Sequence, residues 1–228
     1  MARQARLVLA GQAHYVAQVG AGSARVFEDD ADRLAYLAAL LESSRSCGVA
    51  IHAYALAERR VELLATPRRG ADLARFMQRL GRRYVAQFNR RHGRAGTLWS
   101  GRFGASAIET GPHVLDAMVA IEQLPVRESI GVDALEWTWS SARHHAGERA
   151  DRLIEEHATY WRLGNTPFER EARYAAMLRA PVDALALERL LHAVRGGWPI
   201  GSTAFLKAHG DALGRALQPR PRGRPRAS

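Results

Sequence analysis

The sequence predicts an α+β fold: an antiparallel sheet of the split βαβ type with helices on one face, then a small all-helical domain and a disordered basic tail. Three observations predict it. Over the first 125 residues, apolar spacing alternates between strand and helix periods in the order β-α-β-β-α-β-α. Three more helical stretches follow from residue 167. The chain then ends in alternating proline and arginine, which cannot form a helix.

The first half of the core begins with an extended segment. Residues 6–19 read as a strand interrupted by Gly11, and either Asp29 or Asp30 can cap the helix that follows. That helix ends near Gly48, and its predicted apolar positions are Leu34, Leu37, Leu40 and Leu41. Residues 49–56 and 61–66 are two strands joined by the charged turn 58–60, so they predict a hairpin.

The second half of the core begins with an amphipathic helix over residues 71–92. One stripe of this helix is apolar, with Leu73, Met77, Leu80, Tyr84 and Phe88. The roughly opposite stripe is basic, with Arg75, Arg79, Arg82, Arg83 and Arg90. Residues 102–109 predict a further strand, and residues 114–124 a helix that Pro125 ends.

These elements divide the chain into four parts. Residues 1–125 form the core domain, and 126–166 a connecting segment that packs on it. Residues 167–216 form the helical C-terminal domain, with helices at 168–179, 183–195 and 202–216, and residues 217–228 form the tail. The glycine-rich connection at 196–201 fits either a helix-turn-helix module or a plain helical cap.

The positive charge of the chain is concentrated in two segments. The net charge is +10, and residues 59–102 alone hold twelve arginines against Glu62 and Asp72. Residues 215–228 add five arginines with no acidic residue, while the rest of the chain carries a net charge of −5. Such a field is expected of a protein that contacts phosphate backbones, and a solvated surface face is the alternative.

Composition excludes several other classes of protein. A hydrophobic content of 47% excludes wholesale disorder, and no run of eighteen apolar residues predicts a membrane span. The N-terminus has no signal-peptide cleavage pattern. Cys47 is the only cysteine, which excludes an intramolecular disulfide and a zinc site built on cysteine pairs. We therefore expect a cytoplasmic protein, nucleoid-associated if it binds DNA, with no membrane partner.

Short motifs stand in a fixed order along most of the chain. They are His52-Ala-Tyr-Ala-Leu56, Phe88-Asn-Arg-Arg-His92, Leu98-Trp-Ser-Gly-Arg-Phe103, Leu124-Pro-Val-Arg127, Trp139-Ser-Ser141 and Gly197-Trp-Pro199. In order and spacing they resemble the REP-associated tyrosine transposases, which belong to the HUH single-strand DNA endonucleases. The resemblance implies a ferredoxin-like HUH core whose site takes up single-stranded hairpin DNA. Family members can be dimers, so a homodimer is an open alternative here.

The resemblance also implies a chemical site, and the sequence departs from it at three positions. In the family, two histidines on one strand hold a divalent metal that polarises the scissile phosphate, and a tyrosine on a nearby helix attacks it. Arg60 and Glu62 occupy the histidine positions, and Ala120 occupies the tyrosine position. Arginine has no lone pair to offer a metal, and alanine has no nucleophile. We therefore expect no catalytic residue, no bound metal and no other cofactor, with Arg60 either ion-paired to Glu62 or available to phosphate.

No substitute for the missing groups stands out. Tyr84 lies on an apolar stripe, which favours a role in the core. His52, His92 and the His144-His145 pair are candidates for a rebuilt metal site, but adjacent histidines point to different faces of a regular element. His113 and Glu122, near the lost tyrosine, are interpreted as solvated helix residues.

The resulting hypothesis is a catalytically degenerate relative of these transposases that binds hairpin or single-stranded DNA. Its expected phosphate contacts are Arg68, Arg69, Arg75, Arg79, Arg82, Arg83, Arg90, Arg91 and Arg94, with Arg222 and Arg224 in the tail. The tail resembles the Arg-Gly-Arg-Pro core of an AT-hook, or it is simply basic. Two alternatives remain: a transposase or nickase with a displaced nucleophile, and an RNA-binding or regulatory module on the same scaffold.

Overall fold

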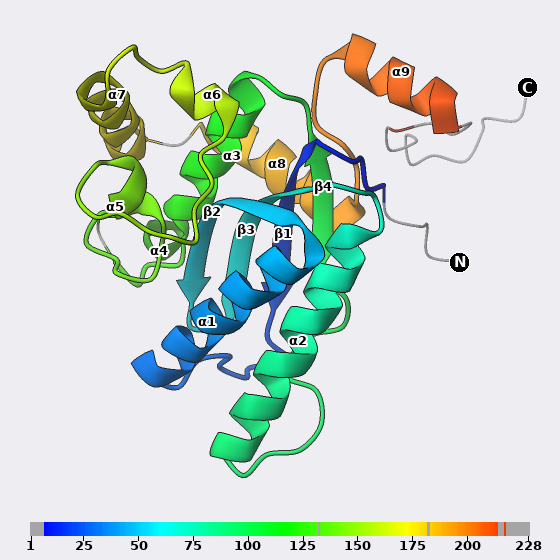
Figure 1. Cartoon of the computed structure of the whole chain (residues 1–228), viewed down its shortest axis with the longest axis vertical. Coiled ribbons are helices and arrows are strands. Elements are labelled where there is room, and N and C mark those ends of the chain that lie inside the picture. The colour runs from blue at the N-terminus through cyan, green and yellow to red at the C-terminus, as the bar shows by residue number, and fades with distance from the viewer. Residues whose placement is uncertain (1–6, 132, 182, 214–216, 218–228) are drawn as a thin grey trace, which may run out of the picture.

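A four-stranded antiparallel sheet forms the centre of the molecule (Figure 1). The computed structural model describes residues 7–131, 133–181, 183–213 and 217. The strands are β1 (Ala13–Val19), β2 (Val49–Ala57), β3 (Arg60–Pro67) and β4 (Gly104–Ile108), in the spatial order β2-β3-β1-β4. This sheet, and the order β-α-β-β-α-β-α of its elements, confirm the predicted fold class.

Helices α1 (Asp30–Cys47) and α2 (Asp72–Arg91) lie side by side on one face of the sheet (Figure 1). The side chain of Asp29 caps α1 by accepting the Asp32 N–H at 3.1 Å, and Gly48 ends it at φ 67°. The prediction for Leu34 was wrong, because its side chain is 60% exposed. The buried stripe of α1 runs through Tyr36 and Leu40, and a residue two positions from Tyr36 points to the opposite side of the helix.

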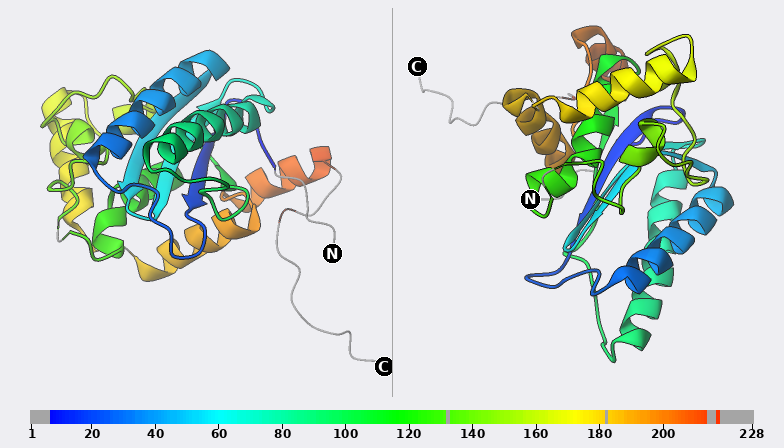
Figure 2. Two further views of the ribbon diagram at one scale, coloured as in Figure 1. Left: turned by 90° about the horizontal axis from the view of Figure 1, so that it is seen from below. Right: turned by 90° about the vertical axis from the view of Figure 1, so that its left-hand side faces the viewer.

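The opposite face of the sheet is also covered, which corrects the prediction of helices on one face only. Helices α3 (Pro112–Glu122) and α8 (Ala184–Gly196) pack there (Figure 2). The physical reason is visible in β2, whose residues are buried on both sides apart from Ala50. A strand that is apolar on both faces must be covered on both.

The segment between α3 and α7 runs along the edge strand β2. It contains three short helices, α4 (Leu124–Arg127), α5 (Ala142–His145) and α6 (Ala158–Trp161). Pro125 lies in the first turn of α4 and does not simply end the preceding helix, because proline is tolerated where no helical N–H bond is needed. Bridges from Ser140 to Ala55 and from Ile154 to Ile51 cover the otherwise open sheet edge.

The C-terminal helices α7 (Pro167–Arg179) and α8 pack against the core, and α9 (Thr203–Leu213) follows α8 with Phe205 buried. The main partners of α7 are α3 and α5, and those of α8 are β4, β1 and α3. Within the described residues they therefore form no helix-turn-helix unit, since none of the three has another as its main partner. Leu217, predicted to lie in the tail, is buried. The division into separate domains stays a prediction.

Candidate nucleic-acid interface

Arg60 and Glu62 point to the sheet face that α3 and α8 cover. They are two residues apart on β3, so their side chains share a face. Glu62 lies opposite Ala17 of β1, and Arg60 lies opposite Val19. The Glu62 side chain is only 1% exposed, whereas that of Arg60 is 31% exposed. The two positions expected from the resemblance to be histidine therefore carry one buried anion and one half-buried cation.

Glu62 is held by three neighbours. Arg127 and Tyr15 both donate to its Oε2, and the Arg60 Nη1 lies 3.6 Å from its Oε1. Burial, and then the negative charge of Glu62, raise the pKa of the Tyr15 hydroxyl well above its ordinary value, so Tyr15 stays a neutral donor. Arg60 also pairs with Glu128 at 2.9 Å. The same-face ion pair expected from the sequence is present.

Ala120 is connected to this pair through Arg127. The Arg127 guanidinium donates to the Ala120 carbonyl oxygen, at 2.9 Å from Nη2 and 3.1 Å from Nε. One side chain thus bridges β3 and α3 and brings the three departing positions together. The sequence showed Arg127 only as part of a motif, because nothing in its spacing relates residue 127 to residue 62.

The residues at this position do not fit a divalent cation. The single carboxylate, Glu62, already has one guanidinium bonded to it and a second within 4 Å. A metal ion there would face two positive charges. In the part of the chain that the structure describes, no group of three or more His, Cys, Asp or Glu side chains could hold a metal ion.

The other polar candidates lie elsewhere. Tyr84 is buried and donates to the Val26 carbonyl, as a core residue does. His113 is half-buried, and its Nδ1 lies 3.8 Å from Asp116 Oδ2. The prediction for Glu122 was wrong, because it is completely buried and accepts hydrogen bonds from Ser141, from His145 at 2.7 Å and from Tyr174 at 2.7 Å. Helical position alone did not show that later segments of the chain would cover it.

The basic stripe of α2 is exposed as predicted, but its arginines differ in their partners. Arg79 and Arg83 both contact Glu42 of α1, at 3.1 and 2.6 Å, and Arg75 contacts Asp72. Among the described residues, Arg82 and Arg90 have no carboxylate within ion-pair distance. These two are the arginines of the stripe most available to an external anion.

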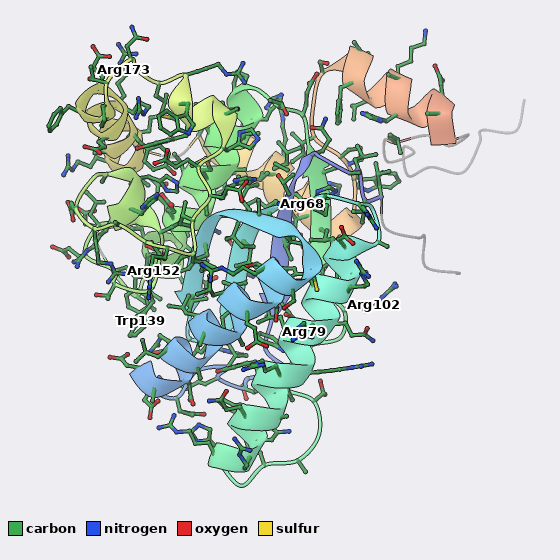
Figure 3. All side chains as sticks on the ribbon, in the orientation of Figure 1. Arg68, Arg79, Arg102, Trp139, Arg152 and Arg173 are labelled. Carbon is green, nitrogen blue, oxygen red and sulfur yellow. The ribbon has the colours of Figure 1, made fainter. Side chains whose placement is uncertain are left out.

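The remaining predicted contacts flank this helix. Arg68 and Arg69 are exposed at its start, and Figure 3 shows Arg68 and Arg79 on the same side of the molecule. Arg94 lies over the Phe88 ring at 5.6 Å. Arg91 binds Asp29 and Asp32, so it ties α2 to the start of α1. Arg222 and Arg224 lie outside the described residues.

Sequence reasoning missed a hollow of about 350 Å³ beside Glu62. It lies between the sheet, α8 and the loop before β4, and three arginines line it: Arg60, Arg102 and Arg195. No spacing rule groups these residues, because they come from a strand, a loop and a C-terminal helix. Only the fold brings them to one cavity.

Comparisons with known proteins support the fold. No family model and no curated protein matches the chain. A solved structure of a REP-associated tyrosine transposase bound to a REP hairpin is similar, with a TM-score of 0.54 and 15% identity over 70% of this chain and 96% of that one. At this identity the likeness is one of fold. None of the described helices is long and apolar enough to cross a membrane.

Proposed function

We propose that this chain is a nucleic-acid-binding protein that uses a tyrosine-transposase fold without its strand-cleavage chemistry. The proposal that the chain binds nucleic acid rests on the many arginines of residues 59–102. The fold exposes these arginines along α2 and around the hollow. The neighbour in fold is bound to a DNA hairpin, which makes hairpin or single-stranded DNA the first partner to test. RNA is the second, because the same guanidinium groups would contact its phosphates.

The residues around Glu62 support the second part of the proposal, that the chain does not cleave nucleic-acid strands. Arg60, Glu62 and Ala120 offer neither a metal ligand set nor a nucleophile, and Arg127 occupies the space between β3 and α3. The buried pair of Glu62 and Arg127 fills the position that the resemblance assigns to the metal site.

The binding test compares matched pairs of arginine variants. Fluorescence anisotropy of labelled DNA hairpins, RNA hairpins and duplex DNA, at several salt concentrations in EDTA, gives the affinity and its salt slope. The variant Arg82→Ala with Arg90→Ala should weaken binding and flatten the slope by about 0.7 per lost contact on single strands. The control, Arg149→Ala with Arg152→Ala, removes the same charge from two exposed arginines of the segment between α5 and α6 and should leave both the affinity and the slope unchanged.

The results separate the alternatives. If the Arg82/Arg90 and Arg149/Arg152 variants change the affinity and the salt slope equally, the α2 stripe is a solvated face that does not contact nucleic acid. If the wild-type protein binds the RNA hairpin more tightly than the DNA hairpin, RNA is its partner. A wild-type protein that binds none of these probes would refute the proposed function.

The tail is proposed as a second, non-catalytic contact with duplex DNA. Arg222 and Arg224 flank the glycine of an Arg-Gly-Arg-Pro segment, a composition suited to the narrow minor groove of A·T tracts. Removing residues 218–228 leaves the buried Leu217 in place. Loss of preference for A·T-rich over G·C-rich duplex, with hairpin binding retained, would support a hook, and equal weakening on both duplexes would leave a sequence-blind basic tail.

A further inference from the structure

The hollow beside Glu62 exists because two residues of its floor are small. Ala17 pairs with Glu62 on one side and with Gly104 on the other, so this row of the sheet carries one long side chain among three residues. Leu191, Val194 and Arg195 of α8 form one wall, and Ser100 and Arg102 form another. The result is a cavity of about 350 Å³, a size that suits a single nucleotide-sized ligand.

The charge around this hollow is positive. Arg60, Arg102 and Arg195 line it, and Arg127 lies behind Glu62. Against these four guanidinium groups stand two carboxylates, Glu62 and Glu128, which leaves two positive charges among the six groups. Arg102 and Arg195 are exposed and have no ion-pair partner within the described residues. A dianion such as a phosphate monoester would balance this charge.

A second observation points to a ligand that also carries a hydrogen-bond donor. Glu62 lines the hollow, and its buried Oε1 atom accepts no hydrogen bond from any described residue, although Arg60 Nη1 lies 3.6 Å away as an ion-pair partner. A buried carboxylate oxygen without a donor is costly, and a hydroxyl group entering the hollow would satisfy it. Carboxylates recognise sugar hydroxyls in this way in other nucleotide sites.

We propose that the hollow binds a nucleotide, with its phosphate on Arg102 and Arg195 and a sugar hydroxyl on Glu62, without a metal ion. The inference deepens the proposed function, because it places one nucleotide of the bound nucleic acid on the sheet face opposite α2. The shared chemistry is a phosphate monoester with a sugar hydroxyl. Its source is either a free mononucleotide or the 5′ end of an RNA strand, whose terminal nucleotide keeps its 2′-hydroxyl.

The first measurement is calorimetric titration of the full chain, in EDTA, with thymidine 5′-monophosphate. Thymidine, which lacks the phosphate, should not bind detectably, and the 2′,3′-dideoxy monophosphate should bind several-fold more weakly. The variant Arg102→Ala with Arg195→Ala should lower the affinity at least tenfold. Both residues are exposed, so the fold should persist, and Arg149→Ala with Arg152→Ala is the matched control.

Hairpins distinguish the two sources of the nucleotide. If strand ends occupy the hollow, a 5′-phosphorylated RNA hairpin should bind the wild type several-fold more tightly than the same RNA hairpin with a 5′-hydroxyl. The Arg102/Arg195 variant should lose this difference. If free nucleotides occupy it, the monophosphate binds and hairpin phosphorylation has no effect. Affinities for both the monophosphate and the 5′-phosphate hairpin that do not depend on Arg102 and Arg195 would overturn the inference.

The same variants separate this inference from the proposed function. Arg82→Ala with Arg90→Ala should weaken hairpin binding and leave monophosphate binding unchanged, because α2 lies on the other face of the sheet. Hairpin binding without any monophosphate binding would sink the nucleotide site alone. Monophosphate binding without any hairpin or RNA binding would sink the proposed function alone.

Discussion

At the scale of single residues, a buried ion pair between Glu62 and Arg127 connects β3 to α4. Both side chains are largely buried, and each satisfies groups that would otherwise be costly: Arg127 binds the Ala120 carbonyl, and Glu62 accepts from Tyr15. A buried ion pair as a whole contributes modestly to the free energy of unfolding, but removal of one partner leaves an uncompensated buried charge, which is strongly destabilising. The sequence identified Glu62 as unusual and could not identify its partner, because the contact spans 65 residues of chain.

This pair predicts a non-additive response to mutation. Glu62→Leu should lower the free energy of unfolding by about 3–5 kcal/mol, because Arg127 loses its counter-charge in a buried site. Glu62→Leu combined with Arg127→Met should cost clearly less than the two single changes added together. Urea unfolding of the four proteins measures this, and strictly additive losses would contradict a coupled pair.

A buried histidine predicts the pH dependence of stability. His14 is completely buried, with Nδ1 donating to the Gln12 carbonyl at 2.8 Å and Nε2 accepting the Leu9 N–H at 3.2 Å. This arrangement needs a neutral ring. Burial lowers the pKa of His14 from 6.5 to about 4, against a smaller opposing effect of the Gln12 bond. Between about pH 6.5 and pH 4, His14 therefore binds a proton in the unfolded chain and stays neutral in the folded chain.

Stability should accordingly be constant above pH 7 and fall as the pH drops from about 6.5 towards 4. The contribution of His14 over this range is about 3 kcal/mol. Urea unfolding between pH 7 and 4.5 measures the slope, and His14→Gln, which keeps an acceptor for Leu9, should reduce it. His157, whose pKa burial also lowers to about 4, leaves a residual slope in the variant. An unchanged slope in His14→Gln would refute this role.

At the scale of elements, α2 was largely predictable from sequence and its electrostatic state was not. Apolar spacing gave its bounds and its buried stripe, because a helix that covers a sheet repeats every 3.6 residues. Sequence spacing did not show that Glu42 of α1 would reach Arg79 and Arg83. That contact depends on how the two helices lie side by side.

The contacts of Glu42 with Arg79 and Arg83 predict that neutralising Glu42 strengthens hairpin binding. Glu42→Gln should release Arg79 and Arg83 for phosphate, raise hairpin affinity about two- to fivefold and steepen the salt slope. Stability should change by less than about 1 kcal/mol, since the ion pairs are about half exposed. Glu188→Gln, an equal charge change on α8, is the control. Weaker or unchanged hairpin binding by Glu42→Gln would mean that the stripe does not face nucleic acid.

At the scale of the whole molecule, the sequence predicted the order of the elements better than their layers. Alternation of spacing showed the strands and the longer helices but not the short helices α4, α5 and α6. The double burial of β2 was needed to place α3 and α8 on the second face (Figure 2). The candidate site divides in the same way. Local runs such as the α2 stripe were visible in the sequence, whereas Arg127, the buried Glu122 and the hollow required contacts between distant segments.

Under the proposed function, this chain binds nucleic acid and does not cut it. The most direct measurement incubates the full chain with an end-labelled single-stranded DNA hairpin in magnesium, in manganese and in EDTA, and reads native and denaturing gels side by side. We expect the same retarded complex in all three conditions, with intact strands and no covalent species on the denaturing gel. A metal-dependent covalent protein–DNA adduct, or no retarded complex in any condition, would contradict it.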